Sequence, residues 1–167
     1  MPGPARPMFD RILVAFDASP ESRRAFQVAL EVAARFRSAL TVATVHPPSR
    51  TAADAELDSL VPIDADGQSL SVLIEQMRTA ATARGVPSLE SVALRGETVP
   101  SLIEYLNHHP HDLAVAGTRG LTRGRRLLLG SVSSGLATDA PCPVLVVRPV
   151  RRAKGAAEGG ALPPHKS

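Results

Sequence analysis

Short apolar runs alternate with segments of helical periodicity along most of the chain. The runs predict five strands, at residues 11–16, 40–46, 89–95, 112–116 and 143–147. Strands that alternate with helices require right-handed crossovers, and therefore a parallel sheet. The pattern predicts a single-domain α/β fold: a doubly wound, Rossmann-like five-stranded sheet of order 3-2-1-4-5 with helices on both faces.

Four segments predict the helices. The first is expected to begin with Ser19 as its cap and Pro20 at its first position, the second to end at Gly85, and the third to be capped by Thr98. The apolar stripe of the first helix is Ala25, Val28, Val32 and Phe36, that of the second is Leu70, Leu73, Met77 and Ala81, and that of the third is Leu102, Ile103 and Leu106. The fourth helix is the shortest and is expected at residues 131–138.

The two ends of the chain lack any periodic pattern. Residues 1–7 are rich in proline and residues 151–167 are rich in glycine, alanine and basic side chains, so we expect two disordered tails around a domain at 8–150. The polar stretch 49–66 predicts a mobile loop near a site. With one cysteine, no signal segment and no long apolar run, the chain predicts a cytoplasmic protein without disulfides, not a membrane protein.

The net charge of +3 changes this picture little, because much of the basic excess lies in the last segment. Both lysines, Lys154 and Lys166, are there, so chemistry in the domain has to work without lysine. Aromatic residues make up only 3% of the chain, which leaves almost no stacking platform for bases and argues against nucleic acid as a partner.

A glycine- and arginine-rich segment follows the fourth predicted strand. Glycines let the backbone approach a phosphate, and helix-start amides and serine hydroxyls bind anions. Arginines add positive potential, so the segment predicts a lysine-free triphosphate cradle. Its glycines are Gly117, Gly120 and Gly130, its helix start is Ser131, Val132 and Ser133, and its arginines are Arg119, Arg123, Arg125 and Arg126.

The predicted topology brings this segment to the end of the first strand. Strands one and four are neighbours where the winding reverses, which is where doubly wound sheets bind ligands. Asp17 ends the first strand and Gly117 ends the fourth. Asp17 is therefore a candidate ligand contact, with helix capping as the alternative.

Other known loops do not fit. A Walker A loop has four residues between its glycines and then lysine, whereas five separate Gly124 from Gly130 and Ser131 follows. A dinucleotide fingerprint needs glycines after the first strand, where this chain has Asp17 to Pro20. The serines near Gly135 lack the first glycine of a nucleophile elbow and an ordered aspartate–histidine pair, which disfavours a serine hydrolase.

At these residues the chain resembles the universal stress protein family, in its ATP-binding branch. Gly117, Gly120, Gly130 and Ser131 match the signature of glycine, two residues, glycine, nine residues, glycine, then serine or threonine. The likeness extends from Phe9 to Pro149 and includes the aspartate after the first strand, residues 45–48 and residues 140–147. Ala18 departs from it, because many members carry glycine there, and Ala43-Thr44 is smaller than the usual bulky pair.

The resemblance implies that Asp17 and the backbone of Val45 contact adenosine, while the glycine segment and its serines hold ribose and phosphates. It also implies ATP, AMP or ADP as the ligand, with Mg²⁺ as a further candidate, and a homodimer through Val144 to Val147. An apolar edge strand supports that dimer independently. We expect that the domain has no catalytic residue and no metal site of its own.

Two other groups of residues have conventional interpretations. His108, His109 and His111 next to Asp112 could suggest a metal, but adjacent histidines at a helix end cannot all face one ion, which favours a solvated loop. Cys142 lies between two prolines before an apolar strand and predicts a buried, inert thiol.

Three functions remain open from the sequence. The first is a nucleotide-dependent regulatory switch with an unidentified protein partner, acting in the stress response that the resemblance implies. The second is a weak Mg²⁺-dependent ATPase or nucleotidyl transferase in which Asp17 holds the metal. The third is a protein-binding dimer whose glycine segment stays empty.

Overall fold

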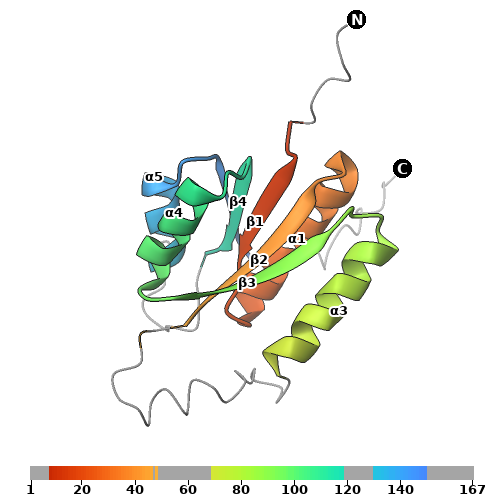
Figure 1. The fold of residues 1–167 in the computed structure, drawn as a ribbon, viewed down its shortest axis with the longest axis horizontal. Helices are drawn as coiled ribbons and strands as arrows, with labels where there is room; N and C mark the ends of the chain where they lie inside the picture. Colours follow the sequence, from red (N-terminus) through yellow and green to blue (C-terminus); the bar gives the residue numbers. More distant parts are fainter. Residues whose placement is uncertain (1–7, 47, 49–68, 119–129, 150–167) are drawn as a thin grey trace, which may run out of the picture.

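The computed structural model describes residues 8–46, 48, 69–118 and 130–149, and these residues form one parallel sheet with helices on both sides (Figure 1). The strands are β1 (Arg11–Ala15), β2 (Ala39–His46), β3 (Leu89–Arg95), β4 (Leu113–Gly117) and β5 (Val144–Val147). The helices are α1 (Pro20–Phe36), α3 (Leu70–Ala83), α4 (Thr98–His108) and α5 (Ser131–Asp139). The predicted tails and the predicted loop 49–66 lie outside the described residues.

The strand order is β3-β2-β1-β4-β5, with every pair parallel, which confirms the predicted topology. Central strand β1 is flanked by β2, where Val14 pairs with Val42, and by β4, where Val14 pairs with Val115. Its middle three residues are completely buried. This explains the continuous apolar run, since a strand covered on both faces has no polar alternation.

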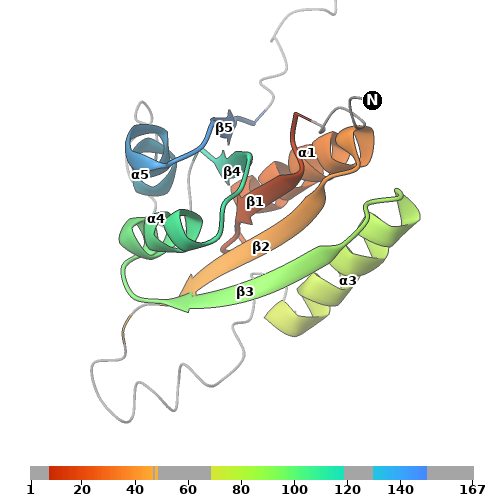
Figure 2. The same ribbon diagram turned by 45° about the horizontal axis from the view of Figure 1, so that its top comes forward.

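Two helices cover each face of the sheet. Helices α1 and α3 pack on one face with Ile12, Val14 and Val42, and helices α4 and α5 pack on the other with Leu13, Ala43 and Ala114. Figure 2 shows the sheet between the two helix pairs. The core is almost entirely aliphatic, as the low aromatic content predicts, and the reversal of winding lies between β1 and β4.

Helix α1 begins as predicted and buries a different stripe from the predicted one. The Ser19 Oγ accepts the Ser22 backbone N–H at 3.1 Å, and Pro20 occupies the first turn. The buried stripe includes Phe26 and Leu30, whereas Val28 and Val32 are only half-buried and Phe36 is exposed. The prediction identified the period and Ala25 correctly but centred the stripe wrongly, because Ala29 and Ala33 are buried in place of the neighbouring Val28 and Val32.

Helix α3 ends near Gly85, as predicted, and this glycine has a φ of +73°. The prediction for the start of α4 is wrong by one residue. Glu97 has the extended backbone of the capping position, without a side-chain cap bond, and Thr98 is already helical. No described helix is both long and apolar enough to cross a membrane.

The carboxylate of Asp112 joins the starts of β1 and β4. Its Oδ2 accepts the backbone N–H groups of Asp10 at 2.8 Å and Arg11 at 2.9 Å, and the Asp112 backbone N–H donates to the Arg11 carbonyl at 2.8 Å. These bonds replace regular strand pairing at Asp112, so β4 begins one residue later than predicted.

Candidate functional site

The carboxyl end of β1 leaves a gap between its two neighbours, which both continue past the last residue that pairs with β1. The Phe16 N–H donates to the Ala43 carbonyl at 2.8 Å, and the chain then leaves the sheet at Asp17. Strand β2 continues to His46 and β4 to Gly117. The pairing with β1 ends at Ala43 on β2 and at Val115 on β4, so Val45 and Gly117 lie past the paired residues on either side of the end of β1.

Val45 contributes such groups from β2. The backbone of Ala43 faces β1, and hydrogen-bonding direction alternates along a strand, so the N–H and C=O of Val45 face the same side. The Val45 side chain is half-buried against α4 and α5. A ligand above β1 would meet a donor and an acceptor on a rigid strand.

Gly117 contributes from β4. The backbone N–H groups of Ala114 and Thr118 point to β5, where they donate to the carbonyls of Pro143 and Val147. Gly117, at the alternate position, faces β1. A Cβ on Gly117 would lie 2.8 Å from the backbone of Glu21 in the first turn of α1, so only glycine lets the end of β4 come this close to α1.

The end of β4 also holds the start of α5. The Gly130 N–H donates to the Thr118 carbonyl at 2.6 Å, and the buried Ser133 hydroxyl donates to the Gly130 carbonyl at 3.1 Å. The Ser133 hydroxyl, which was expected to hold ribose or phosphates, donates in this structure to a backbone carbonyl at the start of its own helix. Thr118 thus connects α5 to the strand end that abuts α1.

The first turn of α5 is open to an anion. Its cap is Gly130, which provides no side-chain cap bond for the amides of Ser131, Val132 and Ser133. Ser131 is exposed and Val132 is half-buried. Uncapped N–H groups and the positive helix end favour negative charge at this position.

Asp17 has a structural role in the turn after β1. Its Oδ1 accepts hydrogen bonds from the backbone N–H of Ser19, at 3.1 Å, and from the Ser19 hydroxyl. The carboxylate thereby organises the cap of α1 while remaining exposed at the carboxyl edge of the sheet. The structure thus supports the capping alternative for Oδ1.

The structure brings together the predicted site residues that it describes at one edge of the sheet: Asp17, Val45, Gly117, Gly130, Ser131, Val132 and Ser133. The other two predicted residues, Arg119 and Gly120, lie outside the described residues, as do Arg123, Arg125 and Arg126. No cluster of three or more histidine, cysteine, aspartate or glutamate side chains able to hold a metal occurs among the residues described.

Comparison with known proteins identifies the family. The pattern of the Universal stress protein family matches residues 8–148. The chain belongs to the universal stress protein family. It is 33% identical over 162 residues to the stress response protein NhaX of Bacillus subtilis, covering 83% of this chain and 98% of that protein.

Solved universal stress proteins share the fold. The protein UspA from Lactobacillus plantarum superposes with a TM-score of 0.73 at 28% identity, covering 83% of this chain and 97% of that one. A universal stress protein crystallised in complex with cAMP superposes with a TM-score of 0.66 at 28% identity, covering 84% and 97%. The five-stranded parallel sheet is therefore the fold of this family.

This universal stress protein also contains a buried histidine that the sequence analysis missed. His111, expected in a solvated loop, is buried, and its Nδ1 lies 2.6 Å from the His109 carbonyl and its Nε2 3.0 Å from the Thr41 Oγ1. A carbonyl only accepts, so Nδ1 carries the proton and Nε2 accepts from the Thr41 hydroxyl. Burial lowers the pKa of His111, and this effect outweighs the backbone hydrogen bond that raises it.

Cys142 of this universal stress protein is half-buried at the start of β5. Burial, followed by the negative charge of Asp112, raises the pKa of the Cys142 thiol. A raised pKa reduces the thiolate fraction at neutral pH, which agrees with the expected inert thiol.

A groove of about 350 Å³ lies at the opposite, amino edge of the sheet. Two cations and two anions line it, namely Arg11, Arg37, Asp10 and Glu90. Because the charges balance, this groove has no evident preference for a polyphosphate, unlike the uncapped start of α5.

Proposed function

We propose that this universal stress protein binds an adenine nucleotide at the carboxyl edge of its sheet and acts as a homodimeric, nucleotide-dependent switch. The observation that carries the proposal is the gap above β1, where the backbones of Val45 and Gly117 are directed towards the end of β1 from its two neighbouring strands. Fixed donors and acceptors of this kind are suited to an adenine ring and a ribose.

The start of α5 would receive the phosphates. Its first-turn amides have no side-chain cap, and Thr118 holds the helix against the end of β4. An anion at an exposed helix terminus gains roughly 0.3–1 kcal/mol from the helix dipole. Arg119 and Gly120 complete the signature in sequence and would add charge and close backbone approach.

A relative with bound cAMP supports an adenine ligand, because it shares 28% identity across 84% of this chain. We propose ATP as the preferred nucleotide, with AMP or ADP as alternatives, because the signature follows the ATP-binding branch of the family. When bound, ATP would supply a negatively charged polyphosphate. Asp17, exposed at this edge, is the carboxylate that would face an accompanying Mg²⁺.

The proposed dimer uses the edge strand β5. Val144 and Val146 direct their backbone groups away from β4, and the strand is apolar over its whole length. Strand β5 is also joined to the site, because the Val147 carbonyl accepts the Thr118 N–H at 3.0 Å. Nucleotide at α5 and pairing at β5 would thus act on the same residue, and this coupling is the proposed switch presented to a regulatory partner in the cytoplasm.

Calorimetric titration of the nucleotide-stripped chain with ATP tests the proposal. We expect saturable binding by the wild type and at least a tenfold weaker affinity for Ser131→Asp, because a carboxylate would then occupy the helix start intended for phosphate. The matched control is Ser71→Asp, which adds the same charge to the exposed first turn of α3. This variant should bind like the wild type.

No heat for the wild type at millimolar ATP would overturn the proposal, and so would equal affinities for both aspartate variants. The same samples separate a switch from an enzyme. Release of inorganic phosphate that requires Mg²⁺ and disappears in Asp17→Ala would favour the enzymatic alternative. Thermal melting of Asp17→Ala has to accompany that assay, because Asp17 also organises the cap of α1.

A further inference from the structure

The sheet has a second open edge at β3, and its exposed backbone groups follow from the pairing with β2. The Leu40 N–H donates to the Ser88 carbonyl at 2.9 Å, and the Gly96 N–H donates to the His46 carbonyl at 2.9 Å. The even-numbered residues of β3 therefore face β2. Leu89, Ser91, Ala93 and Arg95 direct their N–H and C=O groups away from the sheet.

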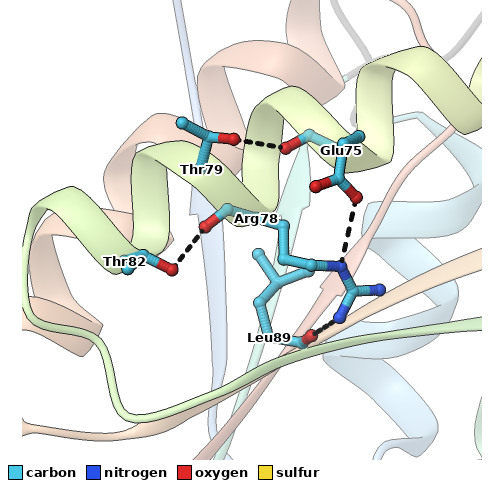
Figure 3. A network of polar contacts seen from close by, with 5 residues as sticks. All are labelled: Glu75, Arg78, Thr79, Thr82 and Leu89. Carbon is cyan, nitrogen blue, oxygen red and sulfur yellow. Dashed lines mark hydrogen bonds and ion pairs between the residues drawn. The ribbon is translucent and has the colours of Figure 1, made fainter.

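Arg78 caps the start of this open edge. From helix α3 its side chain reaches β3, where its Nη1 donates to the Leu89 carbonyl at 2.6 Å (Figure 3). The bond is charge-assisted, because the donor is a guanidinium. The first outward carbonyl of β3 is thereby occupied by a charged group that a pairing strand would have to displace.

The surroundings of Arg78 hold its guanidinium in place. The Glu75 carboxylate lies 3.7 Å from the Arg78 Nε, one helical turn earlier (Figure 3). The hydroxyls of Thr79 and Thr82 donate to the backbone carbonyls of Glu75 and Arg78, each at 3.0 Å. Both hydroxyls therefore use their protons within α3. The exposed Glu75–Arg78 ion pair contributes little to the free energy of folding, but it orients the Arg78 guanidinium towards β3.

The middle of the edge is suited to pairing, whereas at its far end the Arg95 carbonyl accepts the Ser101 hydroxyl at 3.2 Å. Ser91 and Ala93 are small, uncharged and exposed, and no hydrogen bond to their outward backbone groups is recorded within the part of the chain that the structure describes. Two copies of β3 placed antiparallel would bring Ser91 opposite Ala93 without opposing like charges. A second copy of this chain is thus the partner that the edge fits, since a two-fold axis makes such an edge self-complementary.

We propose that Arg78 guards the β3 edge against pairing with β3 of a second copy. Strand-edge association is thereby restricted to the opposite edge of the sheet, and the protein is prevented from forming open chains of sheets. The proposal does not depend on nucleotide binding, or on whether the wild type is a monomer or a dimer, because its measure is the change that loss of Arg78 produces.

Sedimentation of Arg78→Ala against the wild type at rising concentration tests the guard. We expect the average mass of the variant to at least double relative to the wild type. We also expect the Ser91 and Ala93 amides, open in the wild type, to exchange hydrogen about tenfold more slowly once they are paired. Unchanged mass in a variant that melts cooperatively would overturn the proposal.

Two further variants isolate the cause. Arg84→Ala removes the same charge from the end of α3, but the Arg84 Nη1 donates to Glu31 Oε1 at 3.2 Å, not to a strand. This control should keep the wild-type mass. Ala93→Pro added to Arg78→Ala removes an outward N–H without touching the β2 ladder, so the wild-type mass should return. An average mass well above that of the wild type, in Arg84→Ala or in the double variant, would contradict the proposed role of Arg78.

Arg78→Met addresses a folding defect, because it keeps the aliphatic stem of Arg78 and removes only the donors. If Arg78→Ala fails to fold, the mass of Arg78→Met decides the question by the same criterion. Association of this variant would support the guard, and wild-type mass would overturn it.

Discussion

At the scale of single residues, the turn from β1 into α1 contains a local strain. Ala18 has a φ of +63°, in the left-handed region, where a Cβ crowds the following carbonyl. It lies between Asp17, which organises the turn, and Ser19, which caps the helix. Glycine would adopt the same backbone without that crowding.

Ala18→Gly is therefore expected to stabilise the protein. The free energy of unfolding should rise by roughly 0.5–1 kcal/mol, because relief of the left-handed strain exceeds the added entropy of glycine in the unfolded chain. Urea denaturation measures this change in the free energy of unfolding. The control is Ala34→Gly within α1, which should lower the free energy of unfolding by about 1 kcal/mol. A loss of stability in Ala18→Gly as large as in the control would contradict the strain argument.

His111 makes stability depend on pH. Burial lowers the pKa of His111 below its ordinary value of 6.5, so between the two values the unfolded chain binds a proton that the folded chain does not. The contribution of His111 is complete above pH 6.5 and is lost as pH falls towards the folded-state pKa. The charges facing the ring are Arg11, His109 and Asp112.

Urea midpoints measured from pH 7 down to pH 5 test this dependence. The wild type should lose stability over that range, and His111→Gln should lose less, because glutamine has no proton to gain. His108→Gln, at an exposed position on α4, should behave as the wild type does. Identical slopes for all three proteins would show that His111 does not titrate differently on folding.

Side chains differ in how far the sequence reveals them. Ser19 was predictable because a cap acts within three residues, and Gly85 because a left-handed helix end needs glycine. His111 was not predictable, because its partner Thr41 is 70 residues away in the sequence, and only the folded sheet brings them together.

At the scale of elements, α4 and α5 pack closely because α5 carries a glycine on the shared side. A Cβ on Gly135 would lie 2.5 Å from the Val99 Cγ1 in the first turn of α4. This distance is too short for two non-bonded carbons, so alanine at this position would push the Val99 side chain or the helices apart. The contact also bears on the site, since α5 presents the proposed phosphate-binding turn.

A double-mutant cycle tests that contact. Gly135→Ala should lower the free energy of unfolding by roughly 1–3 kcal/mol, despite alanine's better helix propensity, because the added methyl overpacks the contact. Val99→Ala should largely rescue it, giving a favourable coupling of about 1 kcal/mol or more. Additive effects in chemical denaturation would mean that the two positions do not touch.

The sequence predicted where the strands begin and end more accurately than which face of a helix is buried. Every strand limit lies within one residue of its prediction, because apolar runs end where the chain leaves the sheet. The buried side of α1 was misplaced because the predicted stripe followed Val28 and Val32, whereas the neighbouring Ala29 and Ala33 are the buried residues.

At the scale of the whole molecule, the alternation of elements was sufficient to predict the sheet order. Right-handed crossovers leave few other arrangements, and the same rule located the candidate site beside β1 and β4. The resemblance implied a backbone contact at Val45, but the residue pattern could not give the direction of the backbone groups of Val45 and Gly117, because that direction depends on strand register. The Arg78 guard depends on register too, since only pairing shows that the Leu89 carbonyl points outward.

The central position of β1 has a consequence for the nascent chain. Strand β1 is synthesised first, but one of its flanks has no neighbour until Leu113 to Val115 have been synthesised about a hundred residues later. The hydrogen bond from the Asp10 backbone N–H to the Asp112 carboxylate can form only at that stage. A half-finished polypeptide thus exposes one flank of its central strand to other chains, and chaperones would meet that uncovered flank during translation.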